Sequence, residues 1–145
     1  HGIVFYHAVN EGLINPEKSV QIGIRSAVPV EVIDWTLNQG FKVYSAIDVH
    51  ENKISDIVKE IKQRVGNKVY LSFDIDAIDP SQAPGTGTPE AGGLFTHQEI
   101  SFLSKFNDIN FVGMDLVEVS PTVESNITPL LGATIVWEFL SHYVK

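Results

Sequence analysis

"KVYLSFDIDAIDPSQAPGTGTP", residues 68–89, is the stretch that decides the fold. It opens with an apolar run, residues 68–76, that predicts a buried strand and ends on Asp74 and Asp76. A loop rich in Gly, Pro and Thr follows at once. Side chains two residues apart point to the same side of a strand. We therefore expect both carboxylates to project together near its carboxyl end.

Strands and helices alternate along the rest of the chain. We expect strands over 19–24, 41–47, 68–76 and 109–119, and helices over 29–40, 52–66, 96–106 and 125–144. The strands are near-continuous hydrophobic runs, which predicts a three-layer α/β/α fold around a mostly parallel sheet, as one domain over residues 1–145. Functional residues in such sheets gather at the carboxyl ends of the strands.

Two helices carry more specific expectations. Thr96 is the expected N-cap of the helix over 96–106, and Glu99 would complete a capping box with it. The helix over 125–144 is apolar on most of its surface, so we expect it to be deeply buried.

Composition narrows the function classes. The chain has 145 residues, a net charge of −8 and no cysteine, which excludes disulfides and zinc–thiolate sites and fits a cytoplasmic protein. Its ten Lys and Arg residues are dispersed, so nucleic acid is not an expected partner. No stretch approaches the ~20 apolar residues of a membrane span. The acidic balance suits a cationic substrate or a bound metal ion.

The aspartate pair allows two interpretations. In the first, Asp74 and Asp76 simply end a strand, with Asp79 and Pro80 as turn residues. Alternatively, a divalent cation offsets their charge, and oxygen ligands favour Mg, Ca or Mn. Enzymes that transfer nucleotide sugars or phosphoryl groups use a similar aspartate pair with Mg²⁺. The loop over 83–94, however, lacks the Lys of a phosphate-binding P-loop.

A second pair of carboxylates ends the last expected strand. Asp115 and Glu118 are three residues apart in "GMDLVEVSP", so they should face opposite sides, one toward a site and the other toward packing or a cap. The five histidines have no distinguishing context, and each is taken as structural by default.

Together, "SFDIDAIDPSQAPGTGTPEAGGL" and "VGMDLVEVSP" resemble the ureohydrolase superfamily of arginases, agmatinases, guanidinobutyrases and formiminoglutamases. "HGIVFYHAVNEGLINPEKSVQIGIRS" is more similar to agmatinases than to arginases and extends the resemblance over nearly the whole chain. The resemblance implies an arginase-like fold, two Mn²⁺ ions per site and hydrolysis of a small cationic guanidino compound. For an agmatinase, the products are putrescine and urea, a step of polyamine biosynthesis.

The resemblance also implies roles for single residues. Asp74 and Asp76 match two metal-ligand aspartates, and Glu118 matches the carboxylate that binds the guanidinium group. Thr88 would lie beside the substrate, and His1 matches a histidine proposed to shuttle protons. The other metal ligands of the family lie in GGDHS-type and DAHxD motifs, and neither motif occurs here.

The sequence is therefore expected to be the C-terminal half of an agmatinase. The isolated chain should be inactive and hold manganese poorly. The intact protein would be a homo-oligomer, trimer or hexamer, as family members often are. A second hypothesis is a non-catalytic module that assembles with a partner chain, and a third is another ureohydrolase of the same superfamily.

Overall fold

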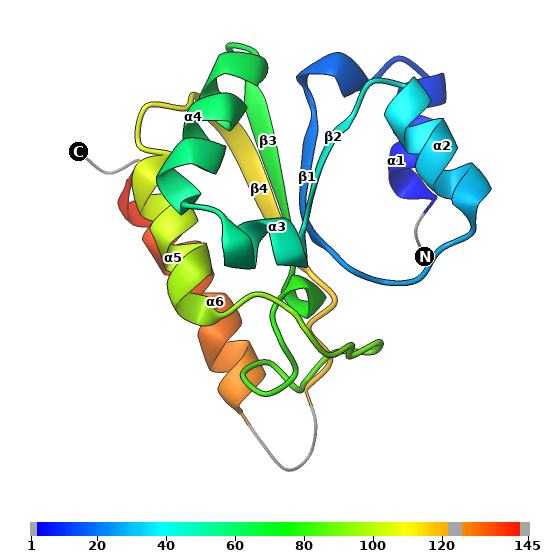
Figure 1. Ribbon diagram of the computed structural model, residues 1–145. Coiled ribbons are helices and arrows are strands. Elements are labelled where there is room, and N and C mark those ends of the chain that lie inside the picture. Colours follow the sequence, from blue (N-terminus) through cyan, green and yellow to red (C-terminus); the bar gives the residue numbers. More distant parts are fainter. Residues whose placement is uncertain (1–2, 122–125, 143–145) are drawn as a thin grey trace.

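Four parallel strands form two pairs in the structure, a computed structural model that describes residues 3–121 and 126–142 (Figure 1). The first pair joins β1 (Val20–Ile24) to β2 (Lys42–Ser45), and the second joins β3 (Val69–Asp74) to β4 (Phe111–Val117). In the described part of the chain, no ladder of hydrogen bonds joins one pair to the other. Both pairs nevertheless pack on one hydrophobic core. The expected α/β fold with parallel strands is confirmed.

Helices lie on both sides of these strands. Figure 1 shows α4, α5 and α6 gathered beside β3 and β4, with α1 and α2 on the opposite side of the strands. The bounds are α1 (Val4–Asn10), α2 (Val30–Asn38), α3 (Ala46–Glu51), α4 (Ile54–Arg64), α5 (Thr96–Lys105) and α6 (Ile127–Ser141), with short 3₁₀ turns η1 (Pro16–Lys18) and η2 (Ile75–Ala77).

Helix α3 begins where the sequence analysis still predicts a strand. Ser45 Oγ accepts a hydrogen bond from Asp48 N–H at 3.0 Å, and Asp48 Oδ2 accepts one from Ser45 N–H at 2.7 Å. This reciprocal capping box satisfies two N–H groups of the first helical turn. It therefore ends β2 at Ser45 rather than at Ile47.

The start of α5 is capped differently from the prediction. Phe95 precedes the helix, and its N–H donates to Gln98 Oε1 at 2.9 Å. The expected box of Thr96 with Glu99 is wrong, because the Glu99 side chain points into the protein and is only 7% exposed.

Helix α6 is less buried than its apolar sequence predicts. Thr128, Gly132, Ile135 and Phe139 are its buried residues. Trp137 on another face is 72% exposed. The expectation of deep burial therefore holds for one stripe of the helix, and several large apolar side chains lie exposed on its other faces.

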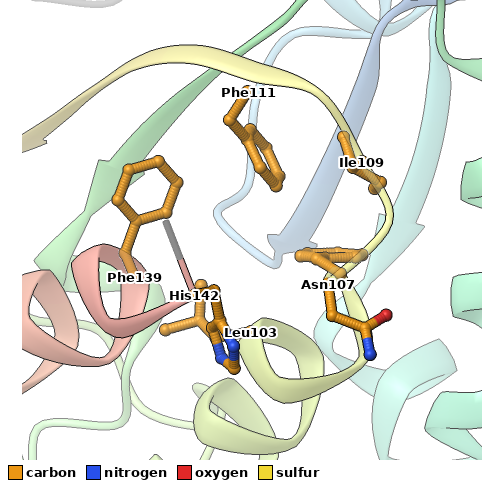
Figure 2. Close-up of a pocket in the computed structure, with 7 residues that line it drawn as sticks. Leu103, Asn107, Ile109, Phe111, Phe139 and His142 are labelled. Atoms are coloured by element: carbon orange, nitrogen blue, oxygen red, sulfur yellow. The ribbon is translucent and has the colours of Figure 1, made fainter. Parts of the chain in front are cut away.

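A cavity of about 40 Å³ lies at the amino-terminal end of β4 (Figure 2). Figure 2 shows Phe111 and Phe139 beside it, with His142 at its edge. Phe111 is paired with Val69 at the start of β3, so this cavity lies at the end of the strands opposite to Asp74. Its lining is mostly aromatic and aliphatic: Leu103, Phe106, Asn107, Ile109, Phe111, Phe139 and His142.

None of the helices in residues 3–121 and 126–142 has the length and apolar character that crossing a membrane requires.

Candidate metal and substrate site

Asp74 and Asp76 lie together at the carboxyl end of β3. Asp74 is the last residue of the strand, whereas Asp76 lies in the 3₁₀ turn η2. The N–H of Asp76 donates to Asp74 Oδ1 at 3.1 Å. The predicted proximity of the two residues is therefore present, but a turn that folds back on Asp74 produces it rather than the alternation of a strand.

The carboxyl group of Asp74 is poorly suited to carrying its charge alone. Its pKa is raised to about 6, mainly by burial and also by the neighbouring carboxylates of Asp76 and Glu118, while the hydrogen bond from Asp76 N–H opposes these effects. A carboxylate in this position is stabilised by a compensating cation. The site thus has the electrostatic character of a cation-binding site.

The glycine-rich loop after η2 reaches back to the same aspartates. Thr88 is exposed, and its hydroxyl donates to Asp76 Oδ2 at 3.1 Å. Thr88 therefore lies against one of the predicted metal ligands, and its place beside a substrate stays a prediction.

Asp79 fixes the two limbs of this loop to each other. Its Oδ2 accepts hydrogen bonds from Gly92 N–H at 2.8 Å and Gly93 N–H at 3.1 Å. These bonds and those from Ser81 lower the pKa of Asp79 to about 2, with the Ser81 bonds contributing most. Gly93 leaves no room for a side chain, because a Cβ there would lie 2.5 Å from Asp79 N.

The same loop is also attached to the end of β4. Ser120 N–H donates to Gly85 O at 2.8 Å, and Thr86 forms an isolated antiparallel bridge with Val119. Gly85 N–H donates in turn to Thr128 Oγ1 at 2.8 Å, which joins the loop to the start of α6. The loop therefore lies across the carboxyl ends of both β3 and β4.

Glu118 follows β4 directly and has an unusual backbone. Its φ is 62°, the only positive φ of a non-glycine residue in the described chain. This left-handed conformation costs an L-residue about 1–2 kcal/mol. Its charge acts on Asp74, so the carboxylate that the resemblance assigns to the substrate lies near the metal-ligand pair.

Asp115 has a different environment. Its Oδ1 accepts a hydrogen bond from Ser72 Oγ at 2.7 Å and its Oδ2 one from Tyr70 OH at 3.1 Å. Ser72 is its partner in the register of β3 and β4. Asp115 therefore joins the two strands.

The histidines are only partly covered by the structure. His1, the predicted proton shuttle, lies outside the described residues. His50 Nε2 lies 3.1 Å from Gly93 O, and Gln98 Nε2 lies 3.4 Å from His50 Nδ1. These contacts place His50 against the glycine loop from the side of α3.

Asp74 and Asp76 are chemically suitable for a hard divalent cation but do not form a complete set. Their carboxylate oxygens are the donors that Mn²⁺ accepts. In the described ranges, no group of three or more His, Cys, Asp and Glu residues is arranged to hold a metal. The two aspartates therefore fit manganese chemically but do not complete a ligand set within the described residues.

Arg25 also contacts this site, although no motif in the sequence singles it out. It follows β1 directly, and its guanidinium contacts the backbone beside Asp76. Its position at the carboxyl end of a predicted strand was the available signal.

The fold and the site together define an α/β protein whose parallel strands end in clustered carboxylates beneath a glycine-rich loop. The sequence profile of the arginase family matches residues 1–141. The chain belongs to the arginase family.

Individual relatives agree with this assignment. An agmatinase of Proteus mirabilis is 51% identical over 142 residues, covering 97% of this chain and 44% of that protein. The structure of a hypothetical agmatinase from Burkholderia thailandensis has a TM-score of 0.86 and 40% identity, with 96% of this chain and 42% of that one covered. Proclavaminate amidino hydrolase from Streptomyces clavuligerus has a TM-score of 0.88 and 38% identity, with 96% and 46% covered. The chain thus spans less than half the length of these relatives.

Proposed function

We propose that this chain supplies part of the active site of a manganese-dependent ureohydrolase that converts agmatine to putrescine and urea. The observation that carries the proposal is the proximity of Asp74, Asp76 and Glu118 at the carboxyl ends of β3 and β4. Similarity to agmatinases over 97% of the chain supports agmatine as the substrate. Agmatine is a dication, which suits this cluster of carboxylates.

Each residue has a distinct role in this proposal. Asp74 and Asp76 would hold the two Mn²⁺ ions together with ligands outside this chain. Bound manganese would supply an activated water nucleophile near neutral pH. Glu118 accepts hydrogen bonds from the guanidinium and holds its charge. Thr88 bounds the substrate side of Asp76, and His1 donates a proton to the leaving amine.

The proposal is tested in a chimera. The matching 142 residues of the Proteus mirabilis agmatinase are replaced by this chain, since the two are 51% identical there. Urea release from agmatine is measured with and without Mn²⁺, beside arginine and guanidinobutyrate. We expect manganese-dependent release from agmatine above all. A folded chimera that releases no urea from any of the three compounds would refute the ureohydrolase proposal, and preference for another compound would reassign the substrate.

Variants of the chimera separate metal binding from substrate binding. Asp74→Ala and Asp76→Ala should lose manganese. Glu118→Gln should retain it and lose about 10²–10³ in turnover, as is typical when a charge-stabilising contact is removed. Glu51→Gln, at an exposed position on α3, is the matched control. Equal manganese loss in the Asp and Glu118 variants would show that the roles are assigned wrongly.

One observation favours a second candidate, a non-catalytic module that assembles with a partner chain. The described residues hold only part of a metal site, and α6 exposes Trp137 and Leu130. Sedimentation and a manganese titration of the 145-residue chain decide between the two. A monomer that binds two Mn²⁺ ions tightly would exclude the module. For the intact enzyme we propose a cytoplasmic homo-oligomer, and the same sedimentation experiment on the chimera measures its size.

A further inference from the structure

Arg25 connects the turn η2 to the glycine-rich loop. Its Nη2 donates to Asp76 O and to Glu90 O, each at 2.7 Å. Its Nε donates to Glu90 O at 3.1 Å, and its Nη1 to Ala77 O at 3.4 Å. All three nitrogens of the guanidinium therefore donate to backbone carbonyls, those of Asp76 and Ala77 in η2 and that of Glu90 in the loop.

A neighbouring contact strengthens this connection. Ser26 Oγ donates to Glu90 Oε2 at 2.5 Å, so the side chain and the backbone of Glu90 are both held by the segment after β1. Arg25 is half-buried, and hydrogen bonds from an ionised donor are about twice as strong as those between neutral groups. The segment after β1 thus fixes the loop from a third strand end, in addition to β3 and β4.

The loop limb that Arg25 holds leads directly to Thr88. Thr88 lies two residues before Glu90 and contacts the Asp76 carboxylate, while Arg25 holds the Asp76 carbonyl. The Arg25 guanidinium therefore helps to position both residues of the contact between Thr88 and Asp76. Within the described residues, no carboxylate forms an ion pair with Arg25, so the group acts through geometry rather than by neutralising a neighbouring acid.

We infer that Arg25 is a positioning residue that holds the metal-ligand turn at Asp76 and the substrate-side limb at Thr88 in fixed register. The inference deepens the proposed function and rests on it for its consequences in catalysis. The structural part, that Arg25 orders the loop, stands independently. The planar fork suits this role, because its three nitrogens reach η2 and the loop at once, whereas lysine presents a single ammonium nitrogen.

Arg64 offers a matched control. It also donates only to backbone carbonyls, with Nε to Ser19 O at 3.0 Å and Nη2 to Gly40 O and Pro16 O. These contacts lie at the opposite end of β1, away from the loop. Loss of Arg64 should therefore affect the stability of the chain without a selective effect on the loop.

The first experiment measures amide hydrogen exchange by NMR in the 145-residue chain. In Arg25→Lys, the amides of Gly92, Gly93 and Gly85 should exchange about tenfold or more faster relative to core amides of β3, since local opening no longer breaks the Arg25 bonds. In Arg64→Lys, loop and core amides should change together. Loop exchange in Arg25→Lys equal to that of the parent, or a loop effect of the same size in Arg64→Lys, would overturn the inference.

The second experiment uses the chimera with the Proteus mirabilis agmatinase, and so keeps the test decisive if the isolated variant does not fold. Arg25→Lys should weaken manganese binding about tenfold or more and lower kcat more than it raises KM, by misplacing groups that act in the transition state. Arg64→Lys should leave both values near those of the parent. Parent-like manganese affinity in Arg25→Lys would overturn the positioning role. If the unmodified chimera neither binds manganese nor hydrolyses agmatine, the proposed function fails, and loop exchange measured in the chimera still decides the role of Arg25.

Discussion

Glu99 is a buried carboxyl whose ionisation should limit the stability of this fold. It lies on α5, is 7% exposed, and burial alone raises its pKa to about 7 from the ordinary 4.5. Replacing it with glutamine keeps the shape and removes the titration. The substitution should therefore change how stability depends on pH more than it changes the packing of α5.

The sign follows from the two states. Below pH 4.5 the group is protonated whether the chain is folded or unfolded, so ionisation costs nothing. Above that pH the unfolded chain releases the proton, while the folded chain keeps it until about pH 7. Each pH unit in this window costs about 1.4 kcal/mol, so the parent loses about 3 kcal/mol across it. Glu99→Gln should not lose this amount.

The assay is urea denaturation of parent and variant between about pH 5.5 and roughly pH 8, above the sequence pI of about 4.9. Over that range the free energy of unfolding of Glu99→Gln should gain about 2 kcal/mol on the parent. Glu51→Gln, at an exposed site on α3, should follow the parent at every pH. A constant difference between Glu99→Gln and the parent across the range would refute the reasoning, whatever its size.

Three other predictions concern the loop and the strand ends. Gly93→Ala places a Cβ 2.5 Å from Asp79 N and should lower the free energy of unfolding by about 1–3 kcal/mol, whereas Gly87→Ala, with nothing within 4 Å, should stay within about 0.5 kcal/mol in the same urea titration. The hydrogen bonds to Asp79 are fully present above its ordinary pKa of 3.8 and lost as the pH falls toward about 2. At about pH 4 pepsin should therefore cut the loop of the parent more slowly than that of Asp79→Asn, and the ratio of the two rates should approach one as the pH falls through this window; a ratio that does not change with pH would contradict this. Glu118→Gly should raise the free energy of unfolding by about 1 kcal/mol by removing a strained φ, and should abolish turnover in the chimera. A loss of stability would show that the backbone there is not strained.

The layered α/β fold was predictable because its information is local. An apolar run such as residues 68–76 predicts both a strand and its burial from consecutive residues alone. The ends of elements were less predictable, since short side chains decide them. Ser45 and Asp48 form a capping box that stops β2 early, and the strand ending at Asp74 turns into η2 before Asp76.

The candidate site likewise has a part that local sequence predicts and a part that it does not. Asp74 and Asp76 are near neighbours in the sequence, so almost any local conformation brings them close. The contact of Arg25 with Glu90 joins residues 65 apart, and that of Gly85 with Thr128 joins residues 43 apart. No periodicity or propensity reports such pairs. Burial of Glu99 was missed for a related reason, because its sequence position suited an exposed cap that Gln98 supplies instead.

The left-handed backbone at Glu118 also bears on the history of this chain. Glycine or asparagine would occupy that conformation at lower cost, so random substitution without selection for activity should replace this residue readily and with a gain in stability. A glutamate at this position is therefore what selection for chemistry would maintain and selection for folding alone would not. Comparing the sequences of close relatives of the same length distinguishes the two cases. Glutamate at this position in all of them would indicate a working active site. Replacement by glycine or asparagine would indicate selection for folding alone.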